Sequence, residues 1–469
     1  MGIIILTMYR PYKTPVIKAS PDLKIPEPRV SKFVVVLCKL LARLYLFLFY
    51  GVAKVMLQED KILLEAFRRA LAGESRCIIA FRHPNGGEPQ LLSWFFLFKL
   101  KRYAARKGIH FARWPHAVFV YSYEVVRWGG WAARFVMPNL GGMPIHHAKM
   151  DTKGMARIYN AIVNGPYPVA LAPEGQVSYT TDSIPRLEPG VIRIGFKAAE
   201  QLEAKAGSDP VTSAGSCPGT IPLEILPVAV YFRFGPWGRA TLELLLKKID
   251  KACGFFGREK LPFTERVRRC RDYILVVNED RYHIRSDDSL SFDERLEQVI
   301  AAALITAERM LGLKSEGEFF HRIYRLRQYC WDRIILPGVT TLDGMSRVER
   351  GVKDLKAGEA WHIGRHQELI DFCWYFRVSL PTEETDIHNK IEYVQNLWDF
   401  ANRTMGGAYS DRVSIFPRKV IIQAAPVINL SERLESYRTD KKAAIAAAMS
   451  DLEMAYLNCI TESGKTKNA

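Results

Sequence analysis

The sequence lacks the patterns that indicate a metal site, a disulfide framework or a repeat. Its eight cysteines are scattered, with no C-x-x-C pair, and no histidines stand at zinc-finger spacing. We therefore expect reduced thiols of the cytosolic kind and no bound metal. No internal repeat of solenoid period is present. The N-terminus lacks a basic segment ahead of its short apolar run, and Gly2 is not followed by Ser or Thr where myristoylation requires it, so we expect neither a cleaved signal peptide nor that lipid anchor.

Acidic residues are the minority, with 50 Asp and Glu against 66 Lys and Arg and a formal net charge of +16. Such an excess favours an anionic partner, which can be nucleic acid, a membrane surface or a phosphorylated substrate. No nucleic-acid-binding motif or stacking aromatic pattern accompanies the charge, so we do not expect a nucleic-acid partner. With 469 residues and 48% apolar content, the chain can form two or three domains with real cores.

Residues 31–57 form a dense apolar stretch that opens on Ser31, a suitable helix N-cap. Four basic residues interrupt it: Lys32, Lys39, Arg43 and Lys54. On one helix these four fall within a wedge of about 60°, which predicts a helix lying in the membrane interface with its cations near anionic headgroups. Two alternatives remain: a helix buried against the following domain, and a transmembrane span, in which each central cation would cost about 2.5–3.5 kcal/mol. The preferred interpretation puts the protein on the cytoplasmic face of a membrane, peripheral or monotopic.

Residues 73–288 alternate strand-like and helix-like segments, which is typical of an α/β domain with a mixed sheet flanked by helices. The expected strands are 76–81, 116–125, 167–175 and 224–234, and the expected helices are 88–108, 155–165 and 190–206. From residue 289 the pattern is helical, beginning with a capping box of Ser291 and Glu294. The expected division is an N-terminal segment 1–72, an α/β domain 73–288 and a mainly helical region 289–469.

The segment RCIIAFRHPNGGEPQLL, residues 76–92, ends a buried strand in a flexible loop that contains a histidine and an acid. A loop at the end of a strand brings His83 to the edge of the sheet, where it meets solvent and substrate. Gly86 and Gly87 supply the backbone freedom that lets Glu88 fold back and accept a hydrogen bond from the imidazole. We expect His83 to act as a general base supported by Glu88. The alternative is that His83 satisfies a turn and Glu88 caps the next helix.

Four segments together resemble the motifs of the glycerolipid acyltransferases, the family of glycerol-3-phosphate and 1-acylglycerol-3-phosphate acyltransferases. Residues 76–92 resemble the H-x-x-x-x-D motif, with Glu88 in place of the usual Asp. LGGMPIHH at 140–147 resembles the second block, which normally closes on Arg, and LAPEGQVS at 171–178 is similar to the third, F-P-E-G-T-R-S. EILPVAVYF at 224–232 is similar to the fourth, an apolar strand around a Pro. The blocks follow the family's order over residues 75–235, and about half of the chain lies outside them.

The resemblance implies transfer of a fatty acyl group from acyl-CoA or acyl carrier protein, as co-substrate and without a cofactor, to a hydroxyl of a glycerolipid-type acceptor. His83 would deprotonate that hydroxyl, and the alkoxide would attack the thioester without a covalent enzyme intermediate. A loop amide near Gly86 is expected to serve the oxyanion. The implied substrate-binding residues are Asn85, Gly86, Gly142, His147, Glu174, Gly175 and Gln176. No metal is implied, since the three histidines near these motifs, His83, His146 and His147, are not spaced as a ligand set.

The sequence departs from the family pattern at its two phosphate grips. His147 replaces the Arg that closes the second block, Val177 replaces the Arg of the third, and Gln176 replaces its Thr. Because Arg binds phosphate in a bidentate way that a neutral His cannot copy, either other cations hold the phosphate or the acceptor has none at that place. The candidate cations are Lys149, Arg186, Arg193 and Lys197. A catalytically weak, membrane-associated lipid-binding or scaffold protein with the same fold is the alternative function.

Overall fold

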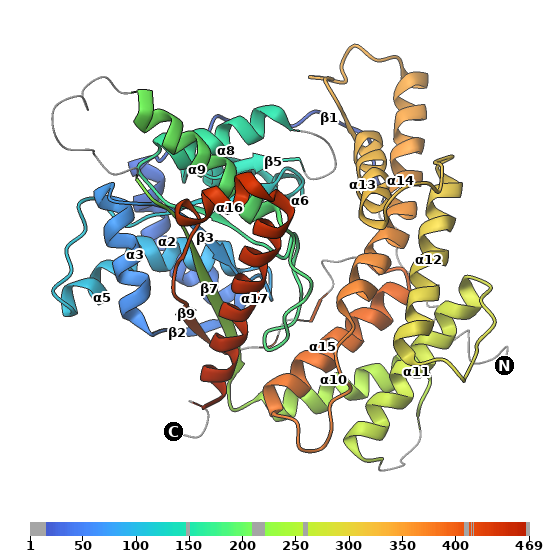
Figure 1. The fold of residues 1–469 in the computed structure, drawn as a ribbon. Helices are drawn as coiled ribbons and strands as arrows, with labels where there is room; N and C mark the ends of the chain where they lie inside the picture. Colours follow the sequence, from blue (N-terminus) through green and yellow to red (C-terminus); the bar gives the residue numbers. More distant parts are fainter. Residues whose placement is uncertain are drawn as a thin grey trace, which may run out of the picture. The chain divides into compact units, whose positions relative to one another are not determined.

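The computed structural model describes residues 16–146, 151–208, 221–256, 261–407, 412–413, 415 and 417–465. The chain folds into two compact units, which Figure 1 shows as a sheet with its covering helices and a set of long helices. The α/β unit comprises residues 25–146, 151–235 and 416–469, and the helical unit comprises residues 1–24, 147–150 and 236–415.

An eight-stranded, mostly parallel sheet forms the centre of the α/β unit. The strand order is β2 (Val52–Gln58), β9 (Arg418–Ala424), β7 (Leu223–Phe234), β3 (Arg76–Phe81), β6 (Val169–Leu171), β4 (Val118–Ser122) and β5 (Met143–Ile145), and β10 (Ile428–Asn429) pairs with β7. β7 runs antiparallel to β9 and β10, and every other described pair is parallel. The carboxyl ends of β3, β6, β4 and β5 therefore meet at one edge of the sheet, where open α/β sheets bind their ligands.

Two hydrophobic layers cover the sheet, one on each face. Because side chains alternate along a strand, Ile78 of β3 enters one layer and Ile79 the other. The first layer contains residues of α8 (Thr152–Asn164), α9 (Gly190–Ser208), α16 (Leu434–Thr439) and α17 (Lys441–Lys465). The second contains residues of α3 (Asp60–Ala72), α4 (Glu88–Phe95), the π-helical turn η1 (Phe96–Leu100) and α5 (Lys101–Arg106). The expected class, a mixed α/β sheet flanked by helices, is confirmed.

The α/β unit contains four further helical segments among the described residues. They are α2 (Lys32–Tyr50), α6 (Val125–Trp128), α7 (Gly130–Asn139) and the 3-10 turn η4 (Ser431–Arg433). The helix expected over residues 31–57 ends at Tyr50, because Gly51 adopts a left-handed conformation with φ 64° and caps it. Lys54 lies in β2, so three of the four expected basic residues share the helix.

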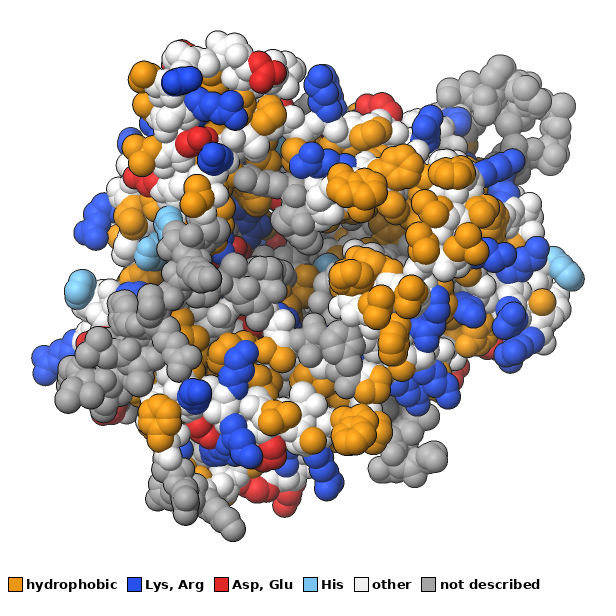
Figure 2. Space-filling model, turned by 180° about the vertical axis from the view of Figure 1, so that it is seen from behind, with side chains coloured by type: hydrophobic (Ala, Val, Ile, Leu, Met, Phe, Trp, Pro, Cys, Tyr) orange, Lys and Arg blue, Asp and Glu red, His pale blue; other side chains and the backbone are white. Residues whose placement is uncertain are grey.

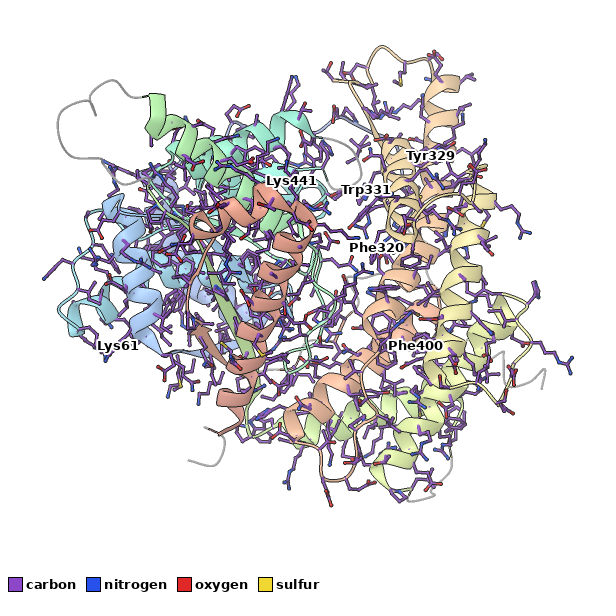
Figure 3. The ribbon with its side chains drawn as sticks, viewed as in Figure 1. Lys61, Phe320, Tyr329, Trp331, Phe400 and Lys441 are labelled. Atoms are coloured by element: carbon purple, nitrogen blue, oxygen red, sulfur yellow. The ribbon has the colours of Figure 1, made fainter. Side chains whose placement is uncertain are left out.

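The helical unit packs through aromatic side chains. Its helices are α10 (Gly238–Cys253), α11 (Phe263–Arg281), α12 (Phe292–Met310), α13 (Phe319–Ile334), α14 (Arg347–Tyr375) and α15 (Ile387–Thr404), and β1 (Ser20–Pro21) pairs in parallel with β8 (Ile335–Leu336). The ring centroids of Phe320 and Trp374 lie 5.1 Å apart, and those of Phe376 and Phe400 5.6 Å apart. Figure 3 labels Phe320 and Phe400 on the helices of this unit. The capping box of Ser291 and Glu294 is present at the start of α12, as predicted.

The division of the chain differs from the expected boundaries. The α/β unit begins at residue 25 rather than 73, so α2, β2 and α3 belong to it. The chain enters the helical unit at residue 236 rather than 289, so α10 and α11 belong to that unit. It returns to the α/β unit at residue 416, where β9 is inserted between β2 and β7. β9 is only seven residues long, and its partners lie nearly 200 residues or more away in sequence, so no local pattern signals its place in the sheet.

Candidate functional site

The loop that follows β3 brings His83 and Glu88 together at the carboxyl edge of the sheet. The Arg82 amide donates to the Val228 carbonyl at 2.9 Å, so the chain stays in register with β7 up to the residue before His83. Gly86 then turns with φ +94°, a conformation that favours glycine. α4 begins at Glu88, with a proline in its first turn.

Glu88 holds the His83 imidazole as the sequence predicts. Nδ1 of His83 lies 2.6 Å from Oε2 of Glu88, and the same oxygen accepts the Gly86 amide at 2.8 Å. The Glu88 side chain is fully buried, whereas that of His83 is 17% exposed. Among the described residues, Nε2 of His83 has no hydrogen-bond partner, so it can receive a proton from a bound molecule.

The buried ion pair of Arg82 and Glu174 holds the backbone of the His83 loop. Nε of Arg82 donates to Oε1 of Glu174 at 2.6 Å, and the other carboxylate oxygen accepts the His83 amide at 3.2 Å. The remaining guanidinium nitrogens of Arg82 donate to the carbonyls of Thr180, Thr181 and Ser183. Burial alone would lower the pKa of Arg82, but the Glu174 carboxylate outweighs it and the pKa is raised. Arg82 and Glu174 therefore form a buried ion pair in which both side chains have hydrogen-bond partners, and we call this pair the charged anchor of the loop.

The third sequence block supports the loop instead of lining a substrate pocket. Glu174 is completely buried and both of its oxygens are bonded, so its expected contact with substrate does not fit this geometry. Gly175 turns with φ +71°, and the Glu188 carboxylate occupies the space where a Cβ would stand. The Ser178 amide donates to the His83 carbonyl at 3.0 Å. The Gly86 amide is likewise bonded to Glu88, so an oxyanion donor near Gly86 would be another amide of the loop.

The second block makes a tight turn at Gly141 and Gly142, between α7 and β5, and then runs through β5. A Cβ on Gly142 would stand 2.8 Å from the Met137 carbonyl oxygen and 3.0 Å from the Tyr121 ring, so packing alone requires this glycine. His146 stacks on Tyr123 at 4.3 Å between ring centroids. His147 and Lys149 lie outside the described residues.

The remaining candidates lie around the loop or on α9. Asn85 and Gln176 are half-buried in the two loops that meet at His83. Arg186, Arg193 and Lys197 have exposed side chains, and Nζ of Lys197 lies 5.4 Å from the centroid of the Tyr159 ring. These cations lie at the surface of the unit, whereas Arg82 is buried.

Tyr50, the last residue of α2, contacts the His83 loop and was not predicted. A Cβ on Gly87 would lie 2.5 Å from Cδ1 of Tyr50, so the ring packs directly on this glycine. Burial raises the pKa of Tyr50, and Tyr45 and the Glu88 carboxylate act in the same direction. The only sequence signal was the Gly-Gly pair, which leaves room for a ring without identifying it.

Comparison with protein-family models, curated proteins and solved structures finds no match. The arguments that follow therefore rest on the chain itself. Within the described residues, no group of three or more His, Cys, Asp or Glu side chains is arranged to hold a metal ion.

Proposed function

We propose that the α/β unit is an acyltransferase that moves a fatty acyl group from acyl-CoA or acyl carrier protein to a hydroxyl of a glycerolipid-type acceptor. The observation that carries the proposal is the 2.6 Å contact between His83 and Glu88, with the second imidazole nitrogen directed to no protein group among the described residues. This is the arrangement of a general base with an orienting carboxylate. Its position at the carboxyl edge of the sheet, and the order of the four motifs, support the same interpretation.

The chemistry requires only proton transfers through His83. Nε2 takes the proton of the acceptor hydroxyl while the oxygen attacks the thioester carbon. Collapse of the tetrahedral intermediate breaks the carbon–sulfur bond, and the leaving thiolate takes the proton back from Nε2. The buried Glu88 carboxylate stabilises the imidazolium in between and fixes the tautomer with the proton on Nδ1.

The experiment is a competition among acceptors. Purified protein and labelled acyl-CoA are offered glycerol-3-phosphate, lysophosphatidate, and neutral or glycosylated lipid alcohols in equal amounts, with His83→Ala as the control. Preference for a phosphorylated acceptor would direct attention to the exposed cations Arg186, Arg193 and Lys197. Preference for a neutral or sugar-bearing acceptor would indicate that the absence of the two family arginines reflects specificity for an acceptor without a phosphate. Thioester turnover no faster than that of the His83→Ala control with every acceptor would overturn the proposal and favour the lipid-binding alternative.

We further propose that α2 docks the protein on an anionic membrane surface. Phe33 and Leu40 are 71% and 73% exposed, and the exposed apolar side chains of α2, from Val36 around the helix to Phe49, span an arc of about 220°. Figure 2 shows hydrophobic side chains gathered over α2, with Lys and Arg beside them. Lys32, Lys39 and Arg43 lie along one border of this arc, within about 40°. Lys32 and Lys39 are exposed, whereas the Arg43 guanidinium donates to the carbonyls of Val52 and Ala53. An apolar face bordered by cations is typical of a helix lying in the headgroup region.

The distribution of charge agrees with docking through the α/β unit. Residues 236–415 carry 28 Lys and Arg and 28 Asp and Glu, and the other residues of the helical unit, 1–24 and 147–150, carry a net +4, so +12 of the excess of +16 belongs to the α/β unit. α2 is also long and apolar enough to cross a membrane by length and composition, with a mean hydropathy of 2.1. Its asymmetric exposure favours the interface, because Val34, Val35 and Leu46 are buried against the protein. The contact of Tyr50 with Gly87 would bring the catalytic loop close to that interface.

Docking is tested by introducing a negative charge on the apolar face of α2. Leu40→Glu should reduce sedimentation with vesicles of phosphatidylserine and phosphatidylcholine, because a carboxylate enters the headgroup boundary of an anionic surface. Leu355→Glu is the matched control, since Leu355 is 75% exposed on α14 of the helical unit. Binding of the parent should also weaken as salt rises. Equal loss of binding in both variants, or binding that is indifferent to lipid charge, would contradict docking through α2, and release by detergent alone would indicate a span.

A further inference from the structure

The C-terminal helix α17 reaches the strand that leads into the catalytic loop. Tyr456 of α17 is completely buried, and its hydroxyl donates to the Ala80 carbonyl in β3 at 2.9 Å. Ala80 precedes His83 by three residues, so this bond is made just before the chain leaves the sheet. The two residues are 376 positions apart in sequence, and no motif links them.

Tyr456 also contacts the charged anchor of the loop. The guanidinium carbon of Arg82 lies 5.9 Å from the centroid of the Tyr456 ring, within the range of a cation–π contact. Arg82 in turn holds Glu174, whose second oxygen accepts the amide of His83. A continuous series of buried contacts thus runs from α17 to the backbone of the proposed base.

We infer that α17 is a positioning element of the acyl-transfer site, and that Tyr456 acts through β3, Arg82 and Glu174 on the backbone of His83. This inference rests on the proposed function. A catalytic side chain on a loop keeps its geometry only where surrounding groups hold its backbone, and a displacement of about 1 Å can lower a rate about a hundredfold. The site would then be complete only after the chain has returned from the helical unit, because Tyr456 follows that unit in sequence.

Alternative roles for the Tyr456 hydroxyl are weaker. The hydroxyl is buried, so it cannot contact an acceptor or a donor, and it is bonded to the backbone of β3 rather than to a side chain. If its role were only to stabilise the fold, its loss would lower the melting temperature and leave the imidazole of His83 unchanged. A measurement at the imidazole therefore separates positioning from stability.

The test compares Tyr456→Phe with Tyr437→Phe in the full chain. Both substitutions remove one hydroxyl from the same hydrophobic layer. Tyr437, however, stacks on Phe196 at 4.3 Å, and among the described residues no hydrogen bond or cation–π contact joins it to β3 or Arg82. The first readout is the imidazole ¹⁵N spectrum of histidine-labelled protein, in which His83→Ala identifies the His83 signals among the ten histidines. The second readout is the steady-state rate of acyl transfer, separated into kcat and KM.

Tyr456→Phe should shift or broaden the His83 signals and lower kcat about threefold to a hundredfold, with KM for either substrate within about twofold. Tyr437→Phe should leave both readouts unchanged. Glu174→Gln, which weakens the charged bond to Arg82 and keeps the shape of the side chain, should change the His83 signals in the same manner. Parent-like His83 signals in Tyr456→Phe would overturn the inference, whatever the activity. If the parent transfers no acyl group to any acceptor, the proposed function fails, and the spectra still decide whether α17 positions His83.

Discussion

Glu88→Gln isolates the charge of the group that orients the base. Oε2 of Glu88 accepts two hydrogen bonds, from His83 at 2.6 Å and from Gly86 at 2.8 Å, and the side chain is fully buried. A glutamine oxygen can keep both bonds, but each becomes a bond between neutral partners. Hydrogen bonds to charged groups contribute about 1.5–3 kcal/mol and neutral ones about 0.5–1.5 kcal/mol.

The loss appears in the rate because the imidazolium forms only during the reaction. A difference of about 1–2.5 kcal/mol in the bond between residues 83 and 88 corresponds to a fall of about 5- to 70-fold in kcat/KM. The assay is steady-state transfer of labelled acyl groups to the preferred acceptor, with circular dichroism and the melting temperature as controls for folding. Activity within about twofold of the parent in a well-folded variant would refute the role of the Glu88 charge. Glu88→Asp keeps the charge but shortens the reach by one methylene, so we expect a smaller loss of kcat/KM than in Glu88→Gln.

Three further predictions test the surroundings of the site. Gly87→Ala should lower activity because its Cβ would stand 2.5 Å from the Tyr50 ring, and Tyr50→Ala in the same chain should restore part of it; no rescue in the kinetic assay would contradict the close contact. Glu174→Ala should reduce the free energy of unfolding by about 3–5 kcal/mol, because it leaves the buried guanidinium of its partner uncompensated, whereas Glu203→Ala at an exposed ion pair should cost less than about 1 kcal/mol; equal costs in urea unfolding would argue against a buried anchor. Burial lowers the pKa of His116 from its usual 6.5 to about 4, so between these pH values the unfolded chain binds a proton and the folded chain does not. The stability that depends on a neutral His116, about 3 kcal/mol, is fully present above pH 6.5 and is lost as the pH falls toward 4. His116→Gln should flatten that part of the pH profile of the unfolding free energy, and an unchanged profile would show that another group is responsible.

Local features of the site were predictable from the sequence. The contact between His83 and Glu88 spans five residues and depends on a strand end, two glycines and an acid, all of which are visible in one short segment. The capping box at Ser291 was equally visible, because both of its partners lie within one turn. The α/β class followed from alternating segments between residues 76 and 234.

Contacts between distant segments were not predictable. The helical pattern predicted for residues 289–469 included the segment that forms α17, but nothing in it indicated that Tyr456 bonds to β3. Glu174 was expected to contact substrate because its motif is exposed to ligand in the family that it resembles, and its burial depends on Arg82, a residue next to His83 that carried no signal of its own. Lys54 was assigned to the helix because the apolar run continues past Gly51, whose left-handed conformation ends the helix.

The most direct test of the account is the rate of acyl transfer by His83→Ala relative to the parent. Both proteins are assayed with labelled acyl-CoA, the preferred acceptor and anionic vesicles, after matching melting temperatures have shown that the variant is folded. Because a positioned general base contributes about 10²–10⁴ in rate, the account predicts that transfer falls at least about a hundredfold. Transfer within about tenfold of the parent would contradict the assignment of His83 as the base, and with it the proposed mechanism.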